Sequence, residues 1–218
     1  MRLLTPLEAR VLGVLVEKQH TVPDTYPLSL NSLVAGCNQK TARSPVIEAS
    51  DADVLGAVDG LKQMSLVFEG SGSRVVRYEH NLGRVMAVPA ASVALLAVLM
   101  LRGPQTAAEL RLNCERLHKF ADISSVEGFL DELAERYPPR VVKLARAAGA
   151  RESRWAHLLC GEVAEPLAAA AAGDPAPTSL AAGELAALKA EQTRLAAEVA
   201  ELRTLVQKMA RELGVDGA

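Results

Sequence analysis

An internal repeat constrains the fold of this chain more than any other feature of its sequence. The pattern Val-x-Gly-x-x-Asp-x-Leu occurs twice, 72 positions apart, and two further blocks recur 77 positions apart. The matching blocks are residues 54–61 with 126–133, 77–80 with 154–157, and 33–37 with 110–114. The blocks keep their order, and the differences in spacing fall between them, where loops tolerate insertions. We therefore predict two similar domains, at residues 1–88 and residues 89–160.

The stretch from Ser50 to Leu82 indicates what each domain contains. Ser50 is a candidate N-cap with Asp53 at the N3 position, and apolar residues then recur at helical spacing. Residues 66–68 start a strand, a Gly-Ser-Gly-Ser turn follows, and residues 75–78 suit a returning strand. A helix followed by such a hairpin is the second half of a winged helix. The predicted fold class is therefore mainly α with small β-hairpins (α+β), built from tandem winged-helix domains.

Capping residues and apolar periodicity place the other elements. Thr5, Ser29 and Thr106 are the expected N-caps of three helices, and either Ser124 or Ser125 should cap the third helix of the second domain. The predicted helices cover residues 6–18, 30–36, 92–101, 106–117 and 126–133, and the predicted strands cover residues 26–28, 141–144 and 155–159.

The C-terminal part of the chain has a different character. Residues 161–183 are rich in Ala, Pro and Gly and predict a linker, and residues 184–214 carry an apolar heptad pattern. The candidate seam residues are Leu185, Leu188, Leu195, Val199, Leu202, Val206, Met209 and Leu213. Val at a with Leu at d favours two parallel strands, which predicts a homodimer through a C-terminal coiled-coil helix. The alternative is a single amphipathic helix that folds back onto the domains.

Composition narrows the cellular setting and the class of partner. The formal net charge of −2 over 218 residues excludes a globally basic nucleic-acid binder, so the distribution of charge matters more. Cys37, Cys114 and Cys160 are odd in number and form no C-x-x-C pair, which favours reduced thiols and a cytoplasmic protein. The N-terminus has no long apolar segment typical of a signal peptide, and the apolar run at residues 92–101 is too short to span a bilayer. We expect no membrane partner.

Four blocks of the sequence resemble the YceH family, a bacterial group usually filed as a domain of unknown function. The blocks are TPLEARVLGVLVEK (residues 5–18), YPLSLNSL (26–33), CNQKTARSP (37–45) and RVVRYEH (74–80). The resemblance covers about residues 3–160 and implies a tandem winged-helix fold. It implies no activity, ligand or catalytic residue, and it does not extend to the heptad segment.

Motifs for catalysis and cofactor binding are missing from the sequence. The chain contains no G-x-x-x-x-G-K-[ST], no strand-linked G-x-G-x-x-G and no G-x-S-x-G, so we predict a protein without catalytic residues or a cofactor. Cys114 and His118 are spaced i,i+4 on one predicted helix, but no third or fourth metal ligand is evident, so we predict no metal site. His80 and His157 occupy equivalent strand positions, where packing or hydrogen bonding is the expected role.

Charge predicts where DNA would be contacted. The third helix of a helix-turn-helix protein normally enters the major groove, but here both third helices carry more acidic than basic residues, and phosphates would repel them. Basic residues gather instead around the hairpins and in the polar loop that follows Cys37. The candidate DNA-binding residues are Lys40, Arg43, Arg74, Arg77, Arg140, Lys143, Arg146, Arg151 and Arg154.

Two functional hypotheses follow from this pattern. The first is a DNA-binding protein, plausibly a regulator, that contacts DNA mainly through basic wings. The alternative is a winged-helix module that does not bind DNA and recognises a protein partner through its acidic third helices and tail. Part of the DNA hypothesis rests on analogy with other winged-helix proteins, and a fold does not fix a function.

Overall fold

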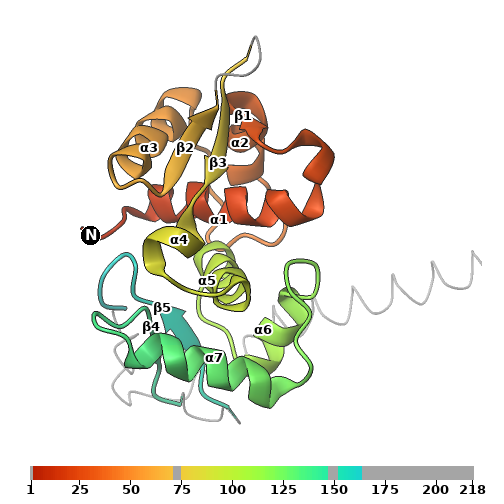
Figure 1. The fold of residues 1–218 in the computed structure, drawn as a ribbon, viewed down its shortest axis with the longest axis vertical. Coiled ribbons are helices and arrows are strands. Elements are labelled where there is room, and N and C mark those ends of the chain that lie inside the picture. The colour runs from red at the N-terminus through yellow and green to blue at the C-terminus, as the bar shows by residue number, and fades with distance from the viewer. Residues whose placement is uncertain (1, 71–74, 147–151, 164–218) are drawn as a thin grey trace, which may run out of the picture. The chain divides into compact units, whose positions relative to one another are not determined.

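The computed structural model describes residues 2–70, 75–146 and 152–163. They form a mainly helical α+β fold with two small antiparallel sheets (Figure 1). The predicted linker at 161–183 lies almost wholly outside the described residues, and the heptad segment at 184–214 lies entirely outside them. No helix among the described residues is long and apolar enough to cross a membrane.

The N-terminal half, residues 2–88, combines helices with a three-stranded sheet. Its elements are α1 (Pro6–Thr21), η1 (Pro23–Thr25), β1 (Leu28–Ser29), α2 (Leu30–Cys37), α3 (Asp51–Gln63), β2 (Val67–Gly70), β3 (Arg77–His80) and α4 (Leu82–Met86). The strand order is β1-β3-β2, and both pairings are antiparallel. Leu28 pairs with Tyr78, and Val67 pairs with His80.

The predicted caps of this half are confirmed. Thr5 accepts a hydrogen bond from the Glu8 N–H, and the Glu8 carboxylate accepts one from the Thr5 N–H, which completes a capping box at α1. Ser50 and Asp53 form the same arrangement at α3. Three details differ from prediction. Helix α1 continues three residues further, to Thr21, and α4 follows β3 where no helix was predicted. The first strand covers Leu28–Ser29 instead of residues 26–28.

The C-terminal half, residues 89–163, repeats the order of three helices and a hairpin. Its elements are α5 (Ala90–Arg102), α6 (Ala107–Asn113), α7 (Ile123–Glu135), β4 (Val141–Lys143) and β5 (Trp155–His157). Strands β4 and β5 pair antiparallel, with Val142 opposite Ala156. An isolated bridge between Gln105 and Trp155 takes the place that β1 occupies in the first half.

Two predicted boundaries in the C-terminal half are wrong. Helix α6 ends at Asn113 rather than near Leu117, so residues 114–121 form a connection instead of a helix. The N-cap of α7 is Asp122, whose carboxylate accepts from the Ser125 N–H, and neither Ser124 nor Ser125 caps the helix. Aspartate, like serine, is a strong N-cap, and Ser125 serves as the N3 partner of Asp122 in a capping box.

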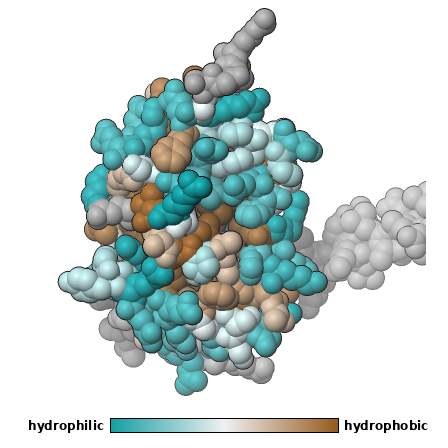
Figure 2. Space-filling view, in the orientation of Figure 1, coloured by the Kyte–Doolittle hydropathy of each residue, from teal (hydrophilic) through white to brown (hydrophobic). Residues whose placement is uncertain are grey.

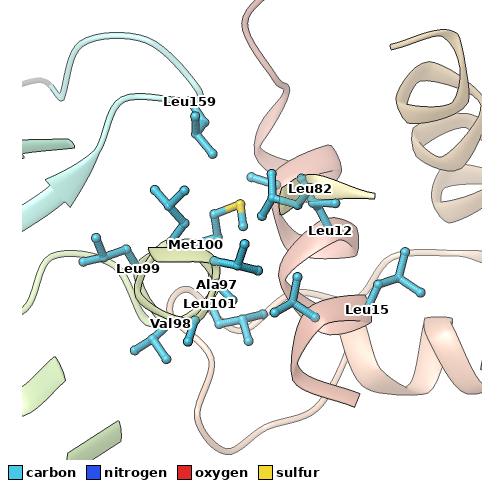
Figure 3. Packing of buried hydrophobic residues seen from close by; sticks show 14 of the residues in the cluster. Leu12, Leu15, Leu82, Ala97, Val98, Leu99, Met100, Leu101 and Leu159 are labelled. Atoms are coloured by element: carbon cyan, nitrogen blue, oxygen red, sulfur yellow. The ribbon is translucent and has the colours of Figure 1, made fainter. Parts of the chain in front are cut away.

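The two halves share one hydrophobic core, because both belong to a single compact unit at residues 1–165. Helix α5 is buried from Ala91 to Leu101 and packs against α1 (Figure 3). Gly13 makes this close approach possible, since a Cβ at this position would lie 2.9 Å from Cγ of Leu101. Hydrogen bonds from the Leu4 N–H to the Leu159 carbonyl and from the Ser44 N–H to the Leu101 carbonyl, both 2.8 Å, add polar ties between the halves.

Most of the surface on the face shown in Figure 2 is hydrophilic, and hydrophobic side chains gather near its centre, in the region of α4 and α5. A pocket of about 570 Å³ lies between α1, β3, α4 and α5, with His80 in its wall. His80 Nε2 lies 2.7 Å from the Gln19 Oε1, and His80 Nδ1 accepts from the Leu82 N–H at 3.4 Å. Burial, followed by the nearby His20, lowers the pKa of His80 to about 4, so this imidazole is neutral and has a hydrogen-bonding role.

Candidate nucleic-acid interface

The C-terminal hairpin is firmly anchored at its base. Trp155 is buried, and its backbone exchanges two hydrogen bonds with Gln105, with N···O distances of 2.7 and 3.0 Å. Beyond that bridge, the Leu144 N–H donates to the Arg154 carbonyl at 2.8 Å. Lys143 lies directly opposite Trp155, and its Nζ is 5.3 Å from the centroid of the indole ring, within the range of a cation–π contact. The hairpin therefore presents its cations from a fixed base.

Three of the predicted DNA-binding residues are exposed on this hairpin and carry charge that the described chain does not neutralise. They are Lys143, Arg146 and Arg154, and none forms an ion pair with a described residue. Glu152, between the strands, is the one acidic residue among the described positions of the hairpin from 141 to 157. Arg140, at the start of the hairpin, is only half-buried, but its Nε is buried without a hydrogen-bond partner in the described chain. Arg151 lies outside the described residues.

The N-terminal half offers fewer free cations than the sequence suggested. Lys40 is exposed in the connection between α2 and α3. Arg77 is half-buried and donates to the carbonyls of Thr25 and Pro27, at 3.1 and 2.7 Å, so its guanidinium ties β3 to the segment before β1. Arg74 lies outside the described residues.

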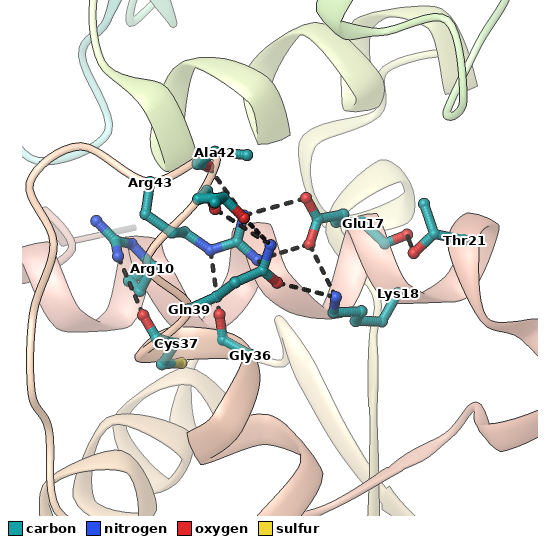
Figure 4. A network of polar contacts seen from close by, with 10 residues as sticks. Arg10, Glu17, Lys18, Thr21, Gly36, Cys37, Gln39, Ala42 and Arg43 are labelled. Atoms are coloured by element: carbon teal, nitrogen blue, oxygen red, sulfur yellow. Dashed lines mark hydrogen bonds and ion pairs between the residues drawn. The ribbon is translucent and has the colours of Figure 1, made fainter. Parts of the chain in front are cut away.

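Arg43 must be removed from the candidate DNA-binding set, because it is buried inside the N-terminal half. Its guanidinium holds Glu17 with two hydrogen bonds, of 3.1 and 2.6 Å, and its Nε donates to the Gly36 carbonyl at 3.1 Å (Figure 4). The Arg43 side chain has no exposed surface. Burial alone would raise the pKa of the Glu17 carboxyl, but its contacts with Arg43 and Lys18 hold that pKa below its usual value. The charge of Arg43 is used within the protein and is not available to a phosphate.

The structure adds basic residues that the sequence reasoning missed. Arg111 lies in the last turn of α6, and Arg116 and Lys119 lie on the connection that follows, all exposed. Arg111 donates to the Ala121 carbonyl at 3.3 Å, which ties α6 to the segment just before α7. The predicted helix ran to Leu117 and so included Arg116, which the structure places on the connection instead. The informative signal was the basic pair Arg116 and Lys119 shortly before the third helix, the helix that enters the major groove in helix-turn-helix proteins.

The exposed faces of α3 and α7 are acidic, as the sequence indicated. Asp59 on α3 pairs with Lys62, and Lys62 also pairs with Glu69 on β2, so the single basic residue of α3 is already neutralised. On α7, Asp131, Glu132 and Glu135 are exposed. A phosphate backbone laid along either helix would meet net negative charge.

The sequence also bears on two other kinds of site, a dimerisation seam and a metal site. The eight candidate dimerisation residues, from Leu185 to Leu213, lie outside the described residues. Within the described residues, no group of three or more His, Cys, Asp or Glu side chains is placed to hold a metal ion. Cys114 is buried, and burial raises the pKa of its thiol to about 12, so this sulfur is a packed thiol rather than a ready thiolate ligand.

Comparison with known proteins places the chain in a family. Residues 4–150 match the family described as protein of unknown function, DUF480. A UPF0502 protein of Leptothrix cholodnii is 69% identical over 217 residues, which covers 98% of this chain and 96% of the relative. UPF0502 proteins of Burkholderia pseudomallei and Burkholderia multivorans are 68% identical, with 99% of this chain and 92% of each relative covered. The chain therefore belongs to the DUF480/UPF0502 family, which confirms the likeness to the YceH group.

Proposed function

We propose that this protein binds DNA without catalysing a reaction, using two winged-helix domains of which the C-terminal one makes the main contact. The observation that carries the proposal is a set of cations on the C-terminal hairpin that are exposed and form no ion pair with a described residue: Lys143, Arg146 and Arg154. Arg116 and Lys119, on the connection before α7, extend the same charge to a second segment of that half. Cations of this kind bind phosphates by releasing condensed counterions, whatever the base sequence.

The order of elements in each half supports this proposal. Three helices followed by an antiparallel hairpin form the pattern of a winged helix, in which the wing lies beside the helix-turn-helix and contacts the DNA backbone. Because the exposed faces of α3 and α7 are acidic, we assign the phosphate contacts to the wing and to the α6–α7 connection. A protein with this role works where the bacterial chromosome is, in the cytoplasm. The heptad pattern of residues 184–214 leads us to propose further that the chain acts as a coiled-coil dimer.

The salt dependence of DNA binding tests the proposal. Changing Lys143, Arg146 and Arg154 to Ala should weaken binding to all DNA sequences alike. Each lost phosphate contact should also reduce the slope of log K against log salt by about 0.9, which gives about 2.7 for three contacts. Arg84→Ala, at an exposed position on α4 outside the hairpin, is the matched control and should leave the slope unchanged. Absence of DNA affinity at low salt in the full-length protein would refute the proposal.

A second candidate function is recognition of a protein partner through the third helices. Its specific support is that Leu55 on α3 and Ile123 on α7 are 39% and 45% exposed next to the acidic residues of those helices. Asp131→Ala combined with Glu132→Ala separates the two functions. DNA binding should be unchanged or stronger in this variant, because repulsion is removed, whereas capture of a protein partner should be lost.

A further inference from the structure

A second cavity, of about 470 Å³, lies where the two halves of the protein meet. Its wall combines residues of α1, of the connection between α2 and α3 with the first turn of α3, of α5, and of β5 with the chain that follows it. Much of the lining is apolar, with Leu7, Ile47, Leu99 and Met100 among its members, and Arg10, His157 and Cys160 add polar groups. Volume and lining are both typical of sites for small molecules, which place a few polar groups in a mainly apolar wall.

Arg10 is the unusual member of this wall. The residue is 3% exposed, and two of its nitrogens donate to the carbonyls of Cys37 and Pro45 at 3.1 and 2.6 Å. Its Nε is buried without an acceptor in the described chain. No described carboxylate lies within ion-pair distance of Arg10. A buried guanidinium whose charge is not matched by an anion is costly and therefore rare.

Two other groups bear on the unmatched charge of Arg10, the buried guanidinium of Arg43 and the ring of His157. Arg43 is buried nearby and holds Glu17 as its own partner, so that carboxylate forms no ion pair with Arg10. Burial, followed by the charge of Arg43, lowers the pKa of Arg10. His157 contributes a second polar atom without a partner in the described chain, its buried Nδ1. Burial lowers the pKa of His157 to about 4, so near neutral pH the ring is uncharged and can donate through one nitrogen.

We propose that this cavity binds a small organic acid with one carboxylate and an apolar body. The carboxylate accepts hydrogen bonds from Arg10 and His157, and the apolar body packs against Leu99 and Met100. Glu48 and Asp53 also line the cavity, and both are exposed, so they disfavour a ligand with a second negative charge. The ligand is therefore a monocarboxylate rather than a dicarboxylate or a phosphate. This site is independent of DNA binding, and its test uses no DNA.

Calorimetric titration of the full chain with phenylacetate tests this inference, with phenylacetamide as the uncharged match and phenylsuccinate as the dicarboxylate. We expect saturable binding of phenylacetate, and binding of the other two that is weaker by about tenfold or more. Arg10→Met should abolish phenylacetate binding, and Lys40→Met, which removes an exposed cation outside the cavity, should leave it intact.

Nuclear magnetic resonance on the unaltered protein provides a readout that does not depend on how well a variant folds. Phenylacetate should shift the signals of the His157 ring and the Met100 methyl group, and phenylacetamide at the same concentration should not. The inference is overturned if the acid and the amide bind alike, or if neither shifts these signals at millimolar concentration. It is also overturned if inorganic phosphate shifts them as strongly as phenylacetate, since the site would then hold any small anion.

Discussion

Replacing Arg43 by alanine should unfold the protein more easily and leave the salt dependence of DNA binding unchanged. The substitution removes both hydrogen bonds to Glu17 and the bonds to the carbonyls of Gly36 and Ala42, at 3.1 and 2.9 Å. The Glu17 side chain, only 16% exposed, would then keep its charge without its main partner. Removal of one member of a buried ion pair costs about 3–5 kcal/mol, largely because the remaining charge stays buried.

The expected cost lies near the lower end of that range. Lys18 Nζ is 3.5 Å from Oε2 of Glu17 and would still neutralise part of its charge. We therefore expect a loss of about 3 kcal/mol in the free energy of unfolding. For a folded unit of this size, each kcal/mol corresponds to about 2–4 °C, so the melting temperature should fall by about 6–12 °C.

Urea denaturation followed by circular dichroism measures this loss of stability. A titration of DNA binding against salt checks that Arg43→Ala leaves the salt dependence unchanged. Lys40→Ala is the matched control, because Lys40 lies in the same connection but is exposed, and its free energy of unfolding should change by less than about 0.5 kcal/mol. If Arg43→Ala is as stable as the wild type and flattens the salt dependence, the placement of Arg43 inside the protein is wrong.

Three further predictions follow from other parts of the molecule. Gly13→Val should destabilise the protein by about 1–3 kcal/mol in urea denaturation, because Leu101 leaves no room for a side chain. Gly56→Ala should instead stabilise α3 by about 0.5–1 kcal/mol, because no atom lies within 4 Å of the new Cβ. The folded-state pKa of His80 is lowered to about 4, so the unfolded chain binds more protons than the folded protein between pH 6.5 and 4. The urea midpoint of unfolding should therefore fall as the pH is lowered through this window. His80→Gln should remove up to about 3 kcal/mol of this loss of stability. Deletion of residues 174–218 should convert a dimer into a monomer in light scattering without unfolding residues 1–165, and a monomeric full-length protein would contradict the coiled-coil prediction.

Features encoded by a few neighbouring residues were predicted well from the sequence. The capping boxes of α1 and α3 each depend on two side chains three positions apart, so the hydrogen-bonding groups are visible in the sequence itself. The α+β fold class and the two hairpins were predicted for a similar reason. Alternation and turn residues predict strands locally, and the recurrence of residues 54–61 at 126–133 gave a second, independent sample of the same pattern.

Features that depend on distant contacts were missed. Arg43 looked like an exposed residue of a polar loop, since nothing nearby in the sequence shows that Glu17, 26 positions upstream, would meet it inside the protein. The cavity beside Arg10 is equally invisible, because it is assembled from four separate segments. The apolar run in α5 predicted burial, but it did not indicate α1 as the helix against which α5 packs.

The packing of α5 also limits how the protein can meet DNA. This helix packs against α1 in one half and against α6, α7 and β5 in the other, so turning one half relative to the other would expose apolar surface from the shared core. Arg136 reinforces the junction by donating to the Met86 carbonyl at 3.1 Å. In the proposed complex with DNA, the acidic face of α3 therefore keeps its position relative to the C-terminal hairpin. Its repulsion of DNA then opposes binding at every ionic strength, and salt screens this repulsion with a Debye length of about 8 Å under physiological conditions. For this reason, neutralising acidic residues of α3 should strengthen DNA binding most at low salt, while loss of the hairpin cations should weaken it most under the same conditions.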